Sequence, residues 1–455
     1  MTKHVTIFDN GFARLYKADA RHLPIPDSSV DCVVTSPPYW GLRDYGIEGH
    51  SWGGDPECEH TWATVMPAGY RSSDTNPGPL QSQGTKNREA LVSQSCAVCG
   101  AWLGTLGLEP TPEAYCANMV EVFREVWRVL KPTGTVWMNL GDSYAGGNYR
   151  GGGVGNASAK QKSNTASQDF MAREAPIIPS GLKPKDLVGI PWRVAFALQA
   201  DGWYLRSDII WSKPNPMPES VTDRPTKAHE YVFLLTKSPR YYYDADAIRE
   251  PHQDVTLQRI TYGLKHKHPN NIGVGIPPVD TDRMGERFAH AGGRNKRSVW
   301  EIATHPYPEA HFATFPEKLV EPCILAGTSE KGVCAVCGKP WERVVEKGNP
   351  VLNAWSKQGA AQYDDSIGGM RPAGLETGST LKHIVPITTI GWQPTCDCNA
   401  DTVPATVLDP FAGSGTTLAV AQRLGRKSIG TDLSEEYLKL ASKRLGAIPM
   451  PMILA

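Results

Sequence analysis

The residues best suited to chemistry are Ser36, Pro37, Pro38 and Tyr39, which follow the apolar run 29–34. Each proline fixes φ and lacks an N–H, so we expect a rigid loop at the end of a strand. The Ser36 hydroxyl and the Pro37 carbonyl can accept both N–H bonds of a planar amino group, and Tyr39 can stack on its ring. A proline-rich turn that only closes a strand uses the same residues, so this segment alone leaves both interpretations open.

A second segment, near the C-terminus, has the composition of a cofactor-binding loop. An apolar strand enters a glycine-rich turn, a helix follows over 418–424, and a second strand over 428–430 leads to Asp432. Glycines let the backbone approach a ligand closely, and an acid at the end of the next strand can bind ribose hydroxyls. The spacing matches neither the dinucleotide fingerprint nor the phosphate-binding loop. The residues of the turn are Asp409, Pro410, Phe411, Gly413, Gly415, Thr416 and Thr417.

Together, these segments resemble the motifs of the S-adenosylmethionine-dependent DNA amino-methyltransferases, which act on cytosine N4 or adenine N6. Ser-Pro-Pro-Tyr comes first and Asp-Pro-Phe-x-Gly-x-Gly last, an order similar to that of the permuted β group. The resemblance implies an α/β fold with a mostly parallel, seven-stranded-type sheet and helices on both faces. It also implies that S-adenosyl-L-methionine is the cofactor, bound by Asp19, Thr35, Phe315, Asp409, Pro410, Phe411, Gly413, Gly415, Thr416, Thr417 and Asp432.

The same resemblance assigns catalysis to the loop Ser36–Tyr39 and implies that the target base is flipped out of the duplex. The motifs around Lys213 and Glu230 resemble the far side of the target-base pocket in this family. Asn139 and Asp142 follow another predicted strand, where they can either line the site or form an ordinary turn.

Several functions remain as alternatives. A serine at the first position of the catalytic motif favours cytosine N4 as the target, with adenine N6 as the alternative. Methylation of RNA or protein is less favoured, because relatives with those activities usually carry the cofactor motif first and lack a basic insertion after the catalytic half. A metal-ribbon DNA-binding protein with an inert core is less favoured because both motifs are intact. Cytosine-C5 chemistry needs a Pro-Cys nucleophile, but Pro322-Cys323 lies in an apolar helical run away from the catalytic loop.

Cysteine spacing predicts two metal sites. Each of the two insertions, about 50–107 and 330–400, carries the sequence C-A-V-C-G together with two further ligand residues. Four sulfur and nitrogen ligands suit a tetrahedral structural Zn²⁺, so we expect about two zinc ions per chain. Reduced cysteines in loops are the alternative. The predicted ligands are Cys58, His60, Cys96 and Cys99 in the first set and Cys334, Cys337, Cys396 and Cys398 in the second.

Charge gives no global signal for nucleic acid, because the chain has 47 Lys+Arg and 47 Asp+Glu. A local signal lies in 249–297, with nine Lys or Arg against five Asp or Glu. Release of counter-ions from phosphates could supply affinity for double-stranded DNA there. A solvated surface loop is the alternative. The predicted DNA-binding residues are Lys265, Lys267, Arg294, Lys296 and Arg297.

The 455 residues suggest one core with insertions, or two domains. We expect a catalytic half over 1–240 with a flexible loop at 145–180, a DNA recognition region over 241–305 and a cofactor half over 306–455. No apolar run approaches the ~18 residues of a membrane helix, and the N-terminus lacks the apolar core of a signal peptide. The expected setting is therefore the bacterial cytoplasm, for a bacterial or phage-encoded enzyme with no membrane partner and possibly a cognate restriction endonuclease.

Overall fold

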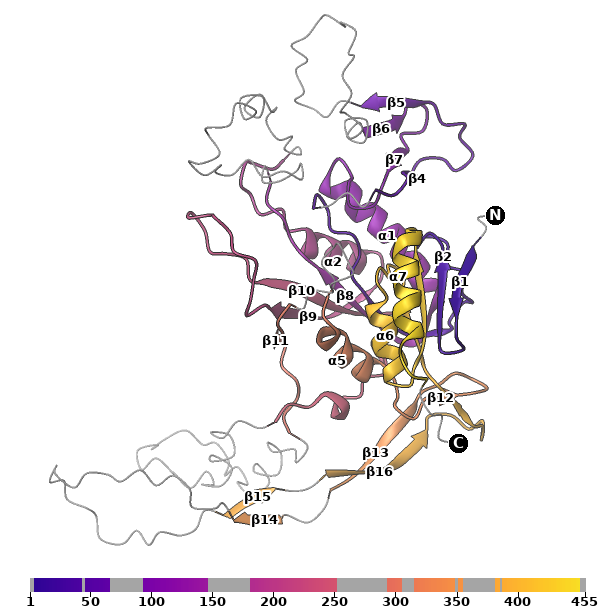
Figure 1. Cartoon of the computed structure of the whole chain (residues 1–455), viewed down its shortest axis with the longest axis vertical. Helices are drawn as coiled ribbons and strands as arrows, with labels where there is room; N and C mark the ends of the chain where they lie inside the picture. The colour runs from indigo at the N-terminus through magenta and orange to yellow at the C-terminus, as the bar shows by residue number, and fades with distance from the viewer. Residues whose placement is uncertain are drawn as a thin grey trace, which may run out of the picture.

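The structure is a computed structural model (Figure 1). It describes residues 4–42, 46–65, 93–145, 181–251, 293–304, 315–347, 351–354, 381–384 and 387–450. The predicted loop 145–180 and most of the region 241–305 therefore lie outside the described residues.

The core is one nine-stranded mixed sheet. Five adjacent strands in this sheet run parallel to one another, and the strand on either side of these five pairs antiparallel with its neighbour. The α/β architecture is as expected, and the sheet is widened at its edges by the short strands β1 and β11. Across the sheet the strands are β1 (Val5–Asp9), β2 (Ala13–Lys17), β19 (Lys427–Asp432), β18 (Thr406–Asp409), β3 (Val30–Thr35), β8 (Leu130–Leu140), β10 (His229–Thr236), β9 (Tyr204–Ser212) and β11 (Val299–Glu301).

The two ends of the chain meet in the middle of this sheet. β18, from the C-terminal part, pairs with β3 in a parallel register that sets Val407 beside Cys32 and Leu408 beside Val33. β19 then pairs with β2. Because the carboxyl ends of parallel strands meet at one edge, the loops after β2, β3, β18 and β19 all emerge on the same side of the sheet.

Helices cover both faces of the sheet. α1 (Pro112–Val129) begins at the predicted cap, where the Thr111 hydroxyl accepts from the Ala114 N–H, and its buried side chains include Phe123. α1 and α2 (Ile190–Ala200) pack on one face. α5 (Glu317–Gly327), α6 (Thr416–Arg423) and α7 (Glu435–Gly446) cover the other face, and the 3-10 helix η4 (Asp246–Ile248) contacts α5 (Figure 1).

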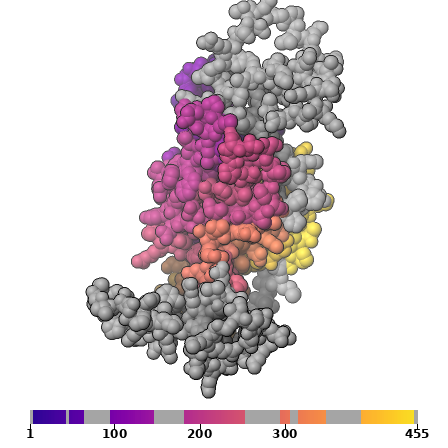
Figure 2. Space-filling model, turned by 90° about the vertical axis from the view of Figure 1, so that its left-hand side faces the viewer, coloured from indigo at the N-terminus to yellow at the C-terminus, as the bar shows by residue number. Residues whose placement is uncertain are grey.

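The two insertions form small antiparallel sheets that project from opposite ends of the molecule (Figure 1). Between them, the segments 181–251 and 293–304 contribute to one continuous face (Figure 2). The first insertion contains β4 (His50–Trp52), β7 (Trp102–Gly104), β6 (Ser93–Cys96) and β5 (Trp62–Val65). The second pairs β12 (Val333–Cys334) with β17 (Thr402–Val403), β13 (Trp341–Lys347) with β16 (Ile387–Pro394) and β14 (Val351–Ala354) with β15 (Leu381–Ile384).

Across the described ranges, every helix is too short or too polar to span a bilayer.

Candidate active site and thiol clusters

The glycine-rich turn after β18 is joined directly to the strand that carries the Ser-Pro-Pro-Tyr loop. The Thr35 hydroxyl donates to Asp409 Oδ1 at 2.8 Å, and the Thr417 hydroxyl donates to the Val34 carbonyl at 3.0 Å. The Gly413 N–H donates to the Asp432 carboxylate at 2.9 Å. These bonds bring the predicted cofactor residues of both chain ends into one assembly.

Two glycines of this turn adopt positive φ, and the absence of a side chain has a different consequence at each. Gly413 has φ +50° and no close neighbour where a side chain would begin, so the space above it stays open to a ligand. Gly415 has φ +76°, and a Cβ there would lie 3.0 Å from that of Ala441 on α7. The second glycine therefore permits helix packing, whereas the first permits close approach of another molecule.

Asp409 is buried and Asp432 is partly buried. Burial raises the pKa of Asp409 to about 6, against the opposing effect of the Thr35 hydrogen bond. Burial also raises the pKa of Asp432. One oxygen of Asp409 has no partner within the described part of the chain, which leaves an acceptor at the base of the turn.

The remaining predicted cofactor residues lie on neighbouring elements. Asp19 lies two residues after the end of β2. The residue between them, Ala18, donates its N–H to the Asp432 carbonyl at 3.2 Å. Arg21 binds the Asp19 carboxylate through two nitrogens, at 2.7 and 3.1 Å. Phe315 directly precedes α5 and packs against the core on that face of the sheet. Residues 305–314, which complete the predicted methionine-side segment, lie outside the described residues.

The Ser-Pro-Pro-Tyr loop faces a polar group formed by β8, β9 and β10. The Tyr39 hydroxyl donates to Glu230 Oε2 at 2.7 Å and lies 3.3 Å from Ser36 Oγ. Asn139 donates to the same Glu230 oxygen at 2.9 Å, and Lys213 pairs with the other oxygen. The Tyr39 ring packs where a side chain on Gly141 would stand, only 2.7 Å from the position of a Cβ. The structure thus joins the predicted catalytic loop to the motifs around Lys213 and Glu230.

The two strand-end residues left open by the sequence have different positions. Asn139 is buried, and its Oδ1 has no partner among the described residues. Asp142 instead accepts the N–H groups of Gly189 and Ile190, both at 3.0 Å, and so caps the start of α2. Asn139 therefore belongs to the site, and Asp142 supports a helix.

A buried segment after β7 holds the catalytic loop in place. The Tyr115 hydroxyl donates to the Pro38 carbonyl at 2.8 Å, and the Trp40 indole donates to the Glu109 carbonyl at 3.0 Å. Glu109 is fully buried and accepts from Gly107 and Asn118. Sequence reasoning did not identify Glu109 or Tyr115, because neither lies in a motif and both act through tertiary contacts.

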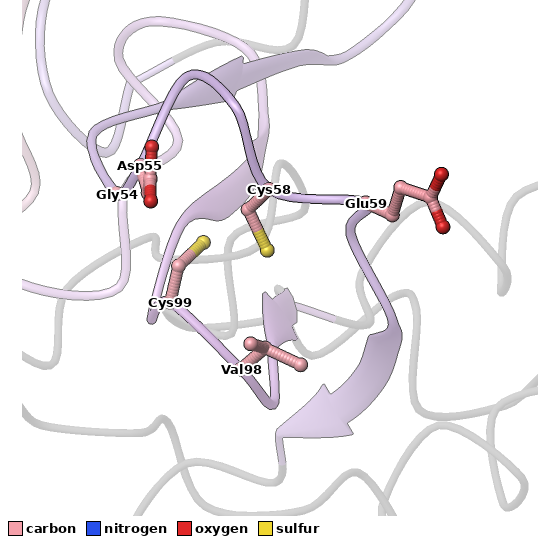
Figure 3. A pocket seen from close by; sticks show the side chains of 6 residues that line it. All are labelled: Gly54, Asp55, Cys58, Glu59, Val98 and Cys99. Carbon is pink, nitrogen blue, oxygen red and sulfur yellow. The ribbon is translucent and has the colours of Figure 1, made fainter.

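Both predicted metal sets come together in space. Within each set the four ligand atoms all lie within 4.8 Å of one another. Figure 3 shows the sulfur atoms of Cys58 and Cys99 turned toward the same space, while Glu59 points away. Backbone N–H groups lower the pKa of Cys96 to about 6, and those of Cys337 and Val336 do the same for Cys334. Four sulfur or nitrogen ligand atoms this close together fit the tetrahedral coordination of a structural zinc ion.

Three of the five predicted DNA-binding residues lie in the described part of the chain. Lys265 and Lys267 lie outside the described residues. Arg294, Lys296 and Arg297 surround the carboxylate of Glu250, at 3.2, 3.6 and 3.5 Å respectively. Part of their charge is therefore neutralised within the chain, although the Arg297 side chain remains 60% exposed.

A mostly parallel α/β sheet with a glycine-rich turn and two strand-end acids is the arrangement typical of enzymes that bind a nucleoside-type cofactor. Residues 30–335 and 402–443 match the family N6_N4_Mtase, described as DNA methylase. Similar proteins include the type II methyltransferase M.Cfr9I of Citrobacter freundii, 33% identical over 95% of this chain and 87% of that protein. M.SmaI of Serratia marcescens is 34% identical over 92% and 85%. The chain belongs to the N6/N4 DNA methylase family.

Solved structures similar to this chain include the PvuII DNA methyltransferase (cytosine-N4-specific). It has 14% sequence identity and a TM-score of 0.42, with 95% of this chain and 86% of that one covered.

Glu109 gives a testable pH dependence. Burial raises its pKa to about 7 from an ordinary value of 4.5, so the folded protein keeps a proton that the unfolded chain loses as pH rises. Stability should therefore fall between these pH values, by roughly 3 kcal/mol from this group. In Glu109→Gln, unfolding in denaturant across this range should show a weaker pH dependence than in the unmodified protein.

The matched control for this measurement is Glu113→Gln, on the same stretch of chain but 65% exposed. It should keep the pH dependence of the unmodified protein. An identical pH profile for Glu109→Gln would show that Glu109 ionises normally in the folded state.

Proposed function

We propose that this chain transfers a methyl group from S-adenosyl-L-methionine to the exocyclic amino group of a base flipped out of double-stranded DNA, with cytosine N4 as the target. The observation that carries the proposal is the bonding of Thr35 to Asp409, one residue before the Ser-Pro-Pro-Tyr loop. This bond supports the proposal because the residues that would accept the amine then lie close to the proposed cofactor turn. Asp409, Pro410, Phe411, Gly413, Gly415, Thr416, Thr417, Asp432, Asp19, Thr35 and Phe315 would bind the cofactor.

The chemistry required of the catalytic loop is modest. An exocyclic amine is a poor nucleophile because its lone pair is conjugated to the ring. Acceptors such as Ser36 Oγ and the Pro37 carbonyl favour a pyramidal nitrogen and stabilise its developing positive charge. The cofactor supplies an electrophilic methyl group, and the amine must be held in line with it. Cys323 is buried on α5 with a strongly raised pKa, so it is unsuited to act as a covalent nucleophile.

The polar group opposite the loop supports cytosine over adenine. Lys213, whose side chain is 18% exposed, is an N–H donor on the far side of Glu230 from Ser36. Cytosine presents a carbonyl oxygen, O2, on the same edge as its amine and separated from it by N3, whereas adenine presents a carbon-bound hydrogen at the corresponding place. A cationic donor therefore matches cytosine better. Adenine N6 is the second candidate, since Asn139 and Ser36 could hold either amine.

Other parts of the proposal concern organisation and setting. We infer a permuted motif order, with a catalytic half over 1–240, a recognition region over 241–305 and a cofactor half over 306–455, since β18 and β19 insert between β2 and β3. Arg294, Lys296 and Arg297, with Lys265 and Lys267, would contact DNA phosphates. Because the similar proteins are named type II methyltransferases, a cognate restriction endonuclease in a bacterial cytoplasm is the proposed partner.

We also propose that each thiol cluster binds one structural zinc ion. The support is the convergence of four ligands in each cluster, from segments far apart in the chain: Cys58 and Cys96 of the first cluster are 38 residues apart. Chance reduced cysteines would have no reason to converge in both insertions.

Replacing Ser36 tests the catalytic assignment. Ser36→Ala removes one acceptor for the target amine, so single-turnover methylation of a duplex should slow by roughly 10²–10³, as for the loss of one oxyanion-hole group. Cofactor affinity, measured by calorimetry, should stay nearly unchanged. Ser442→Ala, in α7, where the hydroxyl donates to the Leu438 carbonyl of the same helix, is the control and should methylate normally. An unchanged rate in Ser36→Ala would mean that other groups hold the amine.

Elemental analysis tests the metal proposal. Protein purified without added metal should contain about two zinc ions per chain, one for each four-ligand set. Each of Cys96→Ser and Cys334→Ser should lose about one zinc, because a structural site with three ligands binds metal far more weakly. Protein that contains no zinc and has freely titratable thiols would contradict the proposal.

A further inference from the structure

A continuous chain of contacts links the first thiol cluster to the proposed cofactor site. It begins at Asp19, whose carboxylate receives two bonds from Arg21. Both side chains are nearly buried, with exposed fractions of 12% and 10%. Burial by itself would raise the pKa of Asp19, but the hydrogen bonds from Arg21 outweigh it and the pKa lies below its ordinary value. Arg21 therefore keeps Asp19 ionised and fixes its direction.

Arg21 is itself held by the first insertion. One of its terminal nitrogens donates to the Ser51 carbonyl at 2.7 Å. Its guanidinium lies 4.1 Å from the centre of the Trp52 ring, a cation–π contact. Trp52 is buried, and its indole donates to the Gly104 carbonyl of β7. The position of Arg21 thus depends on β4, the strand that contains Ser51 and Trp52.

β4 is tied to the thiol cluster through Ser51. The Ser51 hydroxyl lies 3.3 Å from Nε2 of His60, and Nδ1 of the same ring lies 3.4 Å from Cys99 Sγ. A histidine that binds metal through one ring nitrogen usually donates its other N–H to a neighbouring oxygen, which fixes the ring. The Ser51 hydroxyl is in the right place to accept the Nε2–H bond of His60, and Nδ1, which lies beside Cys99, would then bind the metal.

The charge of this insertion argues against a role in binding DNA. Its described residues, 46–65 and 93–104, include Glu48, Asp55, Glu57 and Glu59 but no lysine or arginine. A surface of this sign repels phosphates. These four acids are exposed to solvent, while the insertion contacts the core through the buried side chains of Trp52 and Leu106 and through the bond of Ser51 to Arg21. Support of the cofactor site is therefore the better explanation for the insertion.

The second cluster has no such connection among the described residues. Its C-A-V-C-G segment contacts the core where Lys131 Nζ donates to the Gly338 carbonyl at 3.2 Å. Lys131 also pairs with Asp31, near the start of β3, at the opposite edge of the sheet from the cofactor turn. The two clusters therefore provide a matched comparison within one chain.

We propose that metal binding at the first cluster positions Asp19 for the cofactor, through His60, Ser51 and Arg21. Arg21 and Ser51 are positioning residues: neither needs to touch the reacting atoms. The second cluster stabilises its own insertion and has no effect on cofactor affinity. The inference rests on the proposed binding of S-adenosyl-L-methionine by Asp19.

Two measurements on each variant test this inference: zinc content by elemental analysis and affinity for S-adenosyl-L-methionine by calorimetry, both without DNA. Cys99→Ser should lose about one zinc and bind the cofactor about tenfold more weakly, on the scale seen when outer-shell support is removed. Cys337→Ser should also lose about one zinc but keep the affinity of the unmodified protein. Arg21→Met should keep both zinc ions and weaken cofactor binding about tenfold.

The double variant Arg21→Met/Cys99→Ser makes the test specific. If the two residues act through one chain of contacts, its affinity should equal that of the weaker single variant rather than the product of both losses. Ser51→Ala keeps all eight ligands and so serves if Cys99→Ser does not fold. It should release zinc to a chelator faster from one site and bind the cofactor more weakly.

Three results would overturn the inference. The first is loss of zinc from Cys99→Ser with full cofactor affinity. The second is an equal weakening of cofactor binding in both cluster variants, and the third is a loss of affinity for DNA alone in Cys99→Ser. If the unmodified protein bound no S-adenosyl-L-methionine, the proposed function itself would fail, which is a distinguishable result.

Discussion

The parallel pairing of β3 with β18 is the constraint on which the rest of the structure depends. β3 is buried along its whole length, and its partner comes from more than 370 residues further along the chain. This pairing brings the Thr35 hydroxyl within hydrogen-bonding distance of Asp409, and so the predicted catalytic loop close to the glycine-rich turn. Since a slip of one residue would turn every side chain to the opposite face, buried apolar side chains such as Val33 and Val407 hold the register.

Much of this assembly could be predicted from the sequence, because its determinants are local. The cap at Thr111 and the proline after it place the start of α1, and positive φ explains the glycines of the turn. The two metal sets were identifiable because the C-A-V-C-G segment occurs twice. The position of Asp142 was not predictable, since the helix that it caps starts 48 residues further along.

Electrostatic contacts between distant residues account for most of what the sequence could not show. The cluster Arg294–Arg297 looks like a free basic patch in sequence, but Glu250, more than 40 residues earlier, lies among its cations. Likewise, the unusual pKa of Glu109 comes from burial beneath the catalytic loop, which no motif reveals. Among the residues that the structure describes, the small sheets of the insertions contain few buried apolar side chains, and in such modules metal ions commonly supply the missing stability.

The central claim is that the joined ends of the chain form a site for methylation of a base amine. Its most direct test is to incubate unmethylated DNA with the protein and S-adenosyl-L-methionine, digest it to nucleosides and separate the products by mass spectrometry. N4-methyldeoxycytidine should appear in the digested DNA, and it should be absent when the protein is left out. N6-methyldeoxyadenosine alone would contradict the choice of base, and 5-methyldeoxycytidine or unmodified DNA would contradict the account of the site.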